Sequence, residues 1–158
     1  MSDPRLILIA AMSESNRVIG SQNRLPWSVP GDYQQFLDLV RGQAIFMGRT
    51  TYEIFGDDLR ESAVFVVSRR TEVKGPGVIA GSVAEAIERA RATGKTVFCC
   101  GGASIYEQTL PHATHMFLSL IHGDHEGDAY FPEWPKAEWR EVSRAEKEGF
   151  TFVQLERV

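Results

Sequence analysis

The fold of this chain of 158 residues is decided by Thr96–Tyr106, which reads Thr-Val-Phe-Cys-Cys-Gly-Gly-Ala-Ser-Ile-Tyr. A short apolar run stops at two glycines, and the residues that follow predict a helix over Ala103–Leu110, ended by Pro111. Continuous apolar runs of this length are typical of strands covered on both faces. The stretch therefore predicts a parallel strand that leads directly into a covering helix.

The same arrangement recurs on both sides of this stretch. Further apolar runs predict strands over Leu6–Met12, Ala44–Met47, Ala63–Val67, Val78–Ala80, Thr96–Cys100 and Met116–Ile121. Helical spacing predicts helices over Pro30–Val40, Arg49–Phe55 and Ser82–Ala92. Trp139–Ala145 and Phe150–Glu156 flank a polar turn and predict an antiparallel hairpin. Strands that alternate with helices indicate an α/β fold, and we expect residues 1–158 to form a single domain.

Charge and cysteine content narrow the class of protein. The formal net charge is −4 and no run of Lys or Arg is present, which is unfavourable for binding nucleic acid or an anionic membrane. The early apolar run is far shorter than the roughly 20 residues of a membrane span. The two cysteines, Cys99 and Cys100, are neighbours on a predicted strand, so they point to opposite faces and provide no disulfide framework. We expect a cytoplasmic protein.

Three strand-to-helix junctions have the features of anion sites. They are Met47–Thr51, Val67–Arg70 and Cys100–Ser104. Free backbone N–H groups at a helix start favour anions, and paired glycines allow a ligand to approach the backbone closely. Each junction alone is also explained as an ordinary turn or a solvated surface. Together, at the carboxyl edge of one parallel sheet, they predict a dinucleotide site, where Arg69 and Arg70 would suit the 2′-phosphate of NADPH.

A second candidate site lies within Gly20–Phe36. Asp32 falls in the first turn of a predicted helix, where a carboxylate is favoured in any protein. The functional interpretation is that Asp32 faces inward beside Trp27 and Phe36. There it would hold a planar N–H/NH₂ edge with both oxygens, and the apolar walls would raise its pKa.

The chain resembles the dihydrofolate reductase family over essentially its whole length. The matching stretches are Ile9–Ala11, Val18–Gly20, Leu25–Pro30 with Asp32, Phe36, Met47–Glu53, Val67–Arg69, Gly101–Tyr106, and Glu126–Asp128 leading to Phe131-Pro132. The resemblance implies a three-layer fold with helices on both faces of a twisted, mostly parallel sheet of about eight strands, closed by the C-terminal hairpin.

The resemblance also implies a reaction. It is the NADPH-dependent reduction of 7,8-dihydrofolate to 5,6,7,8-tetrahydrofolate, by hydride transfer to C6 and protonation at N5. This reaction belongs to tetrahydrofolate biosynthesis and one-carbon metabolism, and it is an antifolate target. Asp32, Trp27 and Leu25 are the implied catalytic residues. The stretch Met12 to Leu25 would be a lid to which Asp128 bonds, and the Gly101–Gly102 peptide is expected to be cis.

The implied binding residues form two sets. Substrate binding is assigned to Ile9, Ala10, Ala11, Asp32, Tyr33, Phe36, Ile54, Arg60, Cys100, Tyr106 and Ser119. NADPH binding is assigned to Ala11, Ile19, Gly20, Gly48, Arg49, Thr50, Thr51, Val67, Ser68, Arg69, Arg70, Cys100, Gly101, Gly102, Ala103, Ser104, Ile105 and Tyr106.

One segment departs from the family pattern. Members usually carry Pro-Leu-Pro-Gly-Arg before the third strand, and its arginine clamps the glutamate of folate. Here the segment is Asp57–Ser62 and the position of the arginine is Ser62. Loss of the clamp should weaken binding by about 1.5–3 kcal/mol. Either Arg60 replaces it, or another pterin is the better substrate. Tyr33 stands where an aliphatic residue is usual, which predicts a narrower pocket and altered antifolate binding.

Two other functions stay open at this point. One is the related reductase of riboflavin synthesis, which would need a phosphate-binding cation in the substrate pocket. The other is a weakly active or non-catalytic protein that binds NADPH or a pterin. His122–His125 and Asp128 cluster in one loop, but such residues are common on solvated loops, and we assign no metal site. We expect a monomer whose partners are small molecules.

Overall fold

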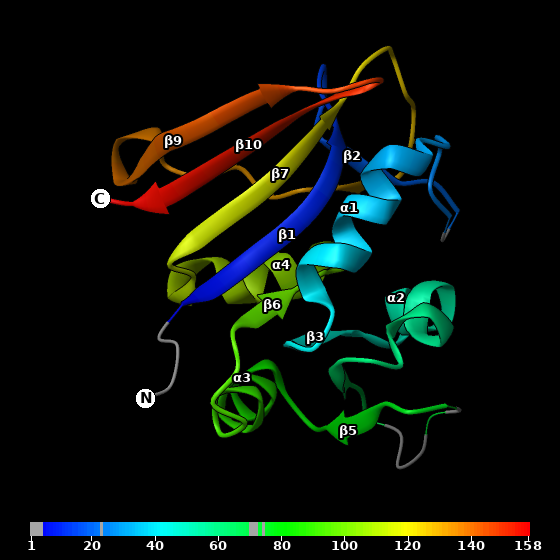
Figure 1. Cartoon of the computed structure of the whole chain (residues 1–158), viewed down its shortest axis with the longest axis vertical. Coiled ribbons are helices and arrows are strands. Elements are labelled where there is room, and N and C mark those ends of the chain that lie inside the picture. The colour runs from blue at the N-terminus through cyan, green and yellow to red at the C-terminus, as the bar shows by residue number, and fades with distance from the viewer. Residues whose placement is uncertain (1–4, 23, 70–72, 74) are drawn as a thin grey trace.

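The computed structural model describes residues 5–22, 24–69, 73 and 75–158. Its centre is an eight-stranded sheet (Figure 1). In spatial order the strands are β5 (Val78–Ala80), β4 (Ala63–Val67), β3 (Ala44–Gly48), β6 (Val97–Cys99), β1 (Leu6–Ser13), β7 (His115–Ile121), β10 (Phe150–Arg157) and β9 (Trp139–Glu146).

Strand direction follows the prediction. All pairs from β5 to β7 are parallel, and β10 is antiparallel to both of its neighbours. The β9–β10 pair is the predicted hairpin. The expected α/β fold, with a mostly parallel sheet and a C-terminal antiparallel hairpin, is therefore confirmed.

Helices cover both faces of the sheet, as expected. They are α1 (Pro30–Val40), α2 (Arg49–Phe55), α3 (Val83–Arg91) and α4 (Ala103–Thr109). Alternate residues of β1 enter two separate cores, Leu6 and Leu8 on one side and Ile7 on the other. The first core contains Ala86 of α3 and residues of α4, whereas the second contains residues of α1 and α2. Two-sided burial explains the continuous apolar runs of the central parallel strands.

Short elements could not be read from the pattern. The strands β2 (Val18–Gly20) and β8 (Ala129–Tyr130) form a separate antiparallel pair. In the described part of the chain, longer elements are connected by the 3₁₀ turns η1 (Gly56–Leu59), η2 (Leu110–His112) and η3 (Lys136–Glu138). Segments of two to four residues are too short for a hydrophobic period to appear.

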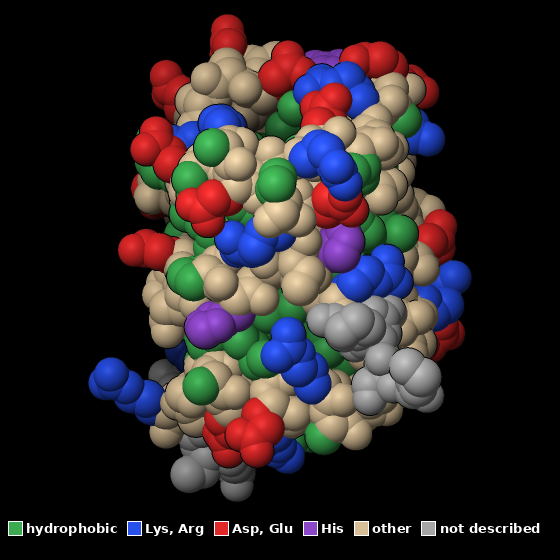
Figure 2. All heavy atoms as spheres, turned by 90° about the vertical axis from the view of Figure 1, so that its left-hand side faces the viewer, with side chains coloured by type: hydrophobic (Ala, Val, Ile, Leu, Met, Phe, Trp, Pro, Cys, Tyr) green, Lys and Arg blue, Asp and Glu red, His purple; other side chains and the backbone are tan. Residues whose placement is uncertain are grey.

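The outer strand β9 is strongly charged. Arg144 bonds to Glu141 at 2.8 Å along the strand, and Arg140 pairs with Glu156 of β10. Charged edge strands disfavour pairing with another chain. Acidic and basic side chains are also interspersed on the molecular face in Figure 2. Among the described residues, no helix is both long enough and apolar enough to cross a bilayer.

Candidate active site

A cavity of about 390 Å³ lies at the carboxyl ends of the central strands. Its walls come from the second half of β1, the inner side of α1, the starts of α2 and α4, and Phe152 of β10. This is where ligands bind in open α/β sheets. Two of its lining residues, Leu25 and Ile54, are large apolar side chains that remain 38% and 43% exposed.

Asp32 is the acidic group on the inner wall. Pro30 occupies the first turn of α1, and the Asp32 N–H donates to the Val29 carbonyl at 3.0 Å. The carboxyl is largely buried and forms a hydrogen bond with the buried Ser119 hydroxyl on β7. Burial raises the pKa of Asp32, and the bond to Ser119 opposes this shift in part.

The surroundings of Asp32 are apolar and aromatic. Ile9, Ala10, Ala11, Phe36, Ile54 and Cys100 line the cavity with it. The rings of Tyr33 and Phe36 lie 6.1 Å apart, and Phe55 is within 5.9 Å of Phe36. Flat apolar walls of this kind suit a planar heterocycle.

Trp27 lies beside the cavity and does not line it. Its ring packs edge-on against His125 with centroids 5.3 Å apart. The Trp27 Nε1–H is buried and has no hydrogen-bond partner in the part of the chain that the structure describes. A buried donor without a protein partner normally reaches a water or ligand.

Tyr106 fixes the inner end of the cavity. It is almost fully buried, donates from its hydroxyl to the Ile9 carbonyl at 2.7 Å, and packs against Phe131. Burial holds the pKa of Tyr106 well above its usual range. The ring lies so close to Gly101 that a Cβ there would be 2.7 Å from Cε2. Gly101 also has φ +99° and begins the cis Gly101–Gly102 peptide.

Two of the predicted anion junctions meet in the cavity. Gly48 donates from its N–H to the Gly101 carbonyl at 2.8 Å, which holds the starts of α2 and α4 together. Neither helix has a side-chain cap, so backbone N–H groups are available on both sides. The lining residues here are Gly48, Arg49, Thr50, Thr51, Gly102, Ala103, Ser104 and Ile105. This arrangement fits the phosphates of a dinucleotide, with Arg49 held by Glu53 at 2.6 Å.

The third junction lies further along the same edge. Val67 is opposite Gly48 in the β3–β4 register, so an elongated ligand can run from β1 to β4. Val67, Ser68 and Arg69 lie outside the cavity lining, and Arg69 is exposed. Arg70 lies outside the described residues.

The expected lid is joined to a distant loop. The Gln22 N–H donates to the Asp128 carboxylate at 3.2 Å, and the Asp128 N–H donates to the Gly20 carbonyl at 3.0 Å. A Cβ on Gly127 would lie 2.2 Å from that same carbonyl oxygen. Only glycine allows this approach. The lid residues Ile19, Gly20 and Leu25 line the cavity together with Asp128.

Arg60 is separated from the main cavity. It lines a second cavity of about 200 Å³, and its guanidinium bonds to Asp57 at 3.2 Å. Ser62 lines the same second cavity and donates from its hydroxyl to the Val40 carbonyl at 2.7 Å. In this arrangement neither residue reaches the cavity that holds Asp32.

Several lining residues were missed from the sequence. They are Arg24, Gln35, Leu39, Phe55, Ala129 and Phe152. Leu39 is one helical turn beyond Phe36, so the helical period could have indicated it. Phe152 could not be found in this way, because it arrives from the hairpin that closes the far side of the sheet.

The cavity and its surroundings define an α/β protein in which a planar pocket with one largely buried carboxyl lies beside two helix starts suited to anions. The family model described as dihydrofolate reductase matches residues 5–157. The chain therefore belongs to the dihydrofolate reductase family.

Individual relatives agree with this assignment. The chain is 35% identical to dihydrofolate reductase HdrB of Haloferax volcanii, over 97% of this chain and 84% of the relative. It is 33% identical to dihydrofolate reductase of Bacillus subtilis strain 168, over 82% and 77%. Dihydrofolate reductase from Enterococcus faecalis, complexed with NADP(H) and RAB-propyl, has the same fold with a TM-score of 0.86, at 24% identity, over 98% of this chain and 96% of that one.

Proposed function

We propose that this chain reduces 7,8-dihydrofolate to 5,6,7,8-tetrahydrofolate with NADPH. NADPH, when bound, supplies the hydride that reaches C6 of the substrate. The protein orders the two rings, excludes water and supplies a proton for N5. The observation that carries this proposal is the largely buried Asp32 carboxyl among apolar and aromatic lining residues.

Asp32 binds the 2-amino and N3 edge of the pterin in this proposal. Asp128, which also lines the cavity, is already engaged by the lid backbone, whereas the side-chain partner of Asp32 among the described residues is the Ser119 hydroxyl. Burial raises the pKa of Asp32, which favours the protonated carboxyl relative to an exposed aspartate, and the protonated form can pass on a proton. Because the carboxyl lies at the edge of the ring and away from N5, the proton travels through a water.

Trp27 and Leu25 complete the catalytic set. The unpartnered Trp27 Nε1–H is a donor for that water, which orders it beside the substrate. Leu25, on the lid, covers the ring and limits entry of bulk solvent. Ile9, Phe36 and Ile54 provide apolar contacts to the pterin and to the aromatic arm of the substrate.

NADPH is held along the carboxyl edge of the sheet. The backbone at Gly48–Thr51 and Gly102–Ile105 receives the phosphates, and Ala11, Ile19, Gly20 and Tyr106 contact nicotinamide and ribose. Arg69, beyond the end of β4, receives the 2′-phosphate, with Ser68 beside it. The register between Gly48 and Val67 supports this path.

The test is NADPH oxidation with dihydrofolate by the wild type and Asp32→Asn. We expect Asp32→Asn to lose kcat on the order of 10²–10⁴-fold, the usual contribution of a general acid. Glu88→Gln, an exposed carboxylate change on α3, is the matched control and should keep full activity. Turnover that is equal in wild type and Asp32→Asn would remove Asp32 from the mechanism. No turnover by wild type, with NADPH bound, would refute the activity.

We also propose that residues 1–158 act as one domain, as a monomer in the cytoplasm, on small molecules alone. The charged outer strand β9 and the interspersed charges on the face in Figure 2 support this proposal. Sedimentation equilibrium at micromolar concentration should give the mass of one chain.

A further inference from the structure

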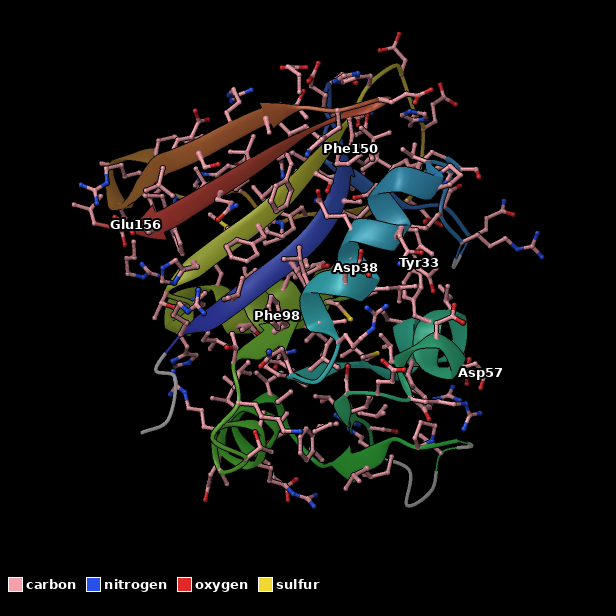
Figure 3. All side chains as sticks on the ribbon, viewed as in Figure 1. Tyr33, Asp38, Asp57, Phe98, Phe150 and Glu156 are labelled. Carbon is pink, nitrogen blue, oxygen red and sulfur yellow. The ribbon has the colours of Figure 1, made fainter. Side chains whose placement is uncertain are left out.

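The bond between Tyr33 and Asp58 links the linings of two cavities, and we call this contact the partition. Tyr33 lines the main cavity and Asp58 lines the second one, and the Tyr33 hydroxyl donates to the Asp58 carboxylate. Tyr33 extends from α1 toward the segment after α2, where it also packs against Phe55 at 5.7 Å (Figure 3). The partition therefore spans the gap between α1 and η1.

Among the described residues that line the second cavity, both cations, Arg41 and Arg60, already form ion pairs. Arg41 is bonded to both Asp38, at 3.1 Å, and Glu61, at 3.0 Å. Arg60 is bonded to Asp57 at 3.2 Å and is 62% exposed. With Asp58 included, four carboxylates face two guanidinium groups, so this region has a formal charge of −2.

Ser62 cannot supply the missing attraction. Its hydroxyl is used by the Val40 carbonyl at 2.7 Å, where it ties the start of β4 to the end of α1. The part of the main cavity next to the partition is lined by uncharged residues, Tyr33, Gln35, Phe36, Leu39, Ile54 and Phe55. A carboxylate tail that left the cavity at this end would meet neutral walls and then excess negative charge.

We propose that this site recognises its substrate through the pterin ring and the neutral aromatic arm, and that it does not read the terminal glutamate. Tyr33, Asp58 and Ser62 are the residues that determine this specificity. The substrate class is thus dihydropterins in general, with or without an anionic tail. The proposal rests on the reductase activity proposed above, and it specifies that the terminal glutamate does not contribute to substrate recognition.

The test compares dihydrofolate with dihydropteroate, which has the same ring and arm and lacks the glutamate. Turnover of both substrates is measured with NADPH, and binding of folate and pteroate is measured separately by titration calorimetry. For wild type we expect kcat/KM and Kd to differ by less than about 5-fold between the two compounds, the limit for exposed charge contacts. A larger preference for the glutamate form would overturn the proposal, and its loss in Arg41→Ala or Arg60→Ala would identify the cation that binds the tail.

The second part of the test asks whether a preference for the glutamate form can be introduced. Ser62→Arg places a guanidinium in the second cavity, and we expect it to create a preference of about 10-fold or more for dihydrofolate. Ser62→Leu is the control of similar bulk without charge and should create none. If Ser62→Arg creates no preference, Ser62 does not determine this specificity and the proposal falls. If neither compound is reduced, the proposed activity is refuted. The ratio of the Kd values for folate and pteroate still shows whether the site binds the glutamate tail.

Discussion

The Ser119 hydroxyl on β7 is hydrogen bonded to the Asp32 carboxyl on α1, and this bond opposes the rise in the pKa of Asp32 that burial causes. Two elements far apart in the chain thus set the protonation of one group. The proposed mechanism uses the protonated form of Asp32, so its rate should fall as the pH rises through that pKa.

Ser119→Ala should move the fall in rate to higher pH. The substitution removes a bond that favours the charged form, so the pKa of Asp32 rises further. The measurement is kcat against pH with saturating NADPH and dihydrofolate. Ser143→Ala, an exposed change on β9, should leave the midpoint in place. A midpoint that moves to lower pH in Ser119→Ala would contradict this assignment.

Asp32→Asn should stabilise the fold at neutral pH. The pKa of Asp32 is raised above 3.8 in the folded protein, so above that raised value the folded state holds a charge that burial disfavours. The cost is present at neutral pH and disappears as the pH falls through the folded pKa. Urea unfolding at several pH values should therefore show a stability gain at pH 7 that shrinks on acidification. A gain that is constant with pH would point to a cause other than the charge.

Gly127→Ala should weaken closure of the lid. The new Cβ would lie 2.2 Å from the Gly20 carbonyl oxygen, so the loop must move away and its bonds through Asp128 must lengthen. We expect single-turnover hydride transfer to slow on the order of 10- to 10²-fold, because the substrate and cofactor rings are less well aligned. Asp124→Ala, on the same loop, is the control. An unchanged rate in Gly127→Ala would mean that the lid does not depend on this contact.

Arg69→Ala should discriminate between the two nicotinamide cofactors. If Arg69 binds the 2′-phosphate, its loss costs about 1.5–3 kcal/mol, or one to two orders of magnitude in the KM for NADPH. The KM for NADH should hardly change, since NADH has no such phosphate, and this cofactor is the internal control. Equal increases for both cofactors would indicate a general disturbance of the loop.

Gly101→Ala should destabilise the protein more than Gly94→Ala. Both glycines have positive φ, +99° and +75°, but a Cβ at Gly94 has no atom within 4 Å. Gly94→Ala therefore isolates the backbone cost of about 1–2 kcal/mol. Gly101→Ala adds about 1–3 kcal/mol of overpacking against Tyr106, measurable by urea unfolding. Equal losses in the two variants would show that the Tyr106 ring moves aside freely.

Long elements were predictable because local pattern and burial agree. The bounds of α1 and α2 follow from Pro30, Gly48 and helical spacing, and the apolar runs locate the strands of the main sheet. The β2–β8 pair was not predicted, since it depends on the loop bonds of Asp128 and not on a period. The ion pair between Arg60 and Asp57 could not be predicted either, because it depends on how the two side chains are oriented within one turn.

The position of β1 in the sheet has a further consequence, for folding kinetics. β1 is central, and its partners begin at Val97 of β6 and His115 of β7, so it stays unpaired until much later segments are formed. By contrast, β3 and β4 are joined by a short connection and can pair early. Sheets with such distant pairings fold slowly. We expect the sheet to assemble from its β3–β4 side toward the centre, so that the ligand cavity is among the last features to form.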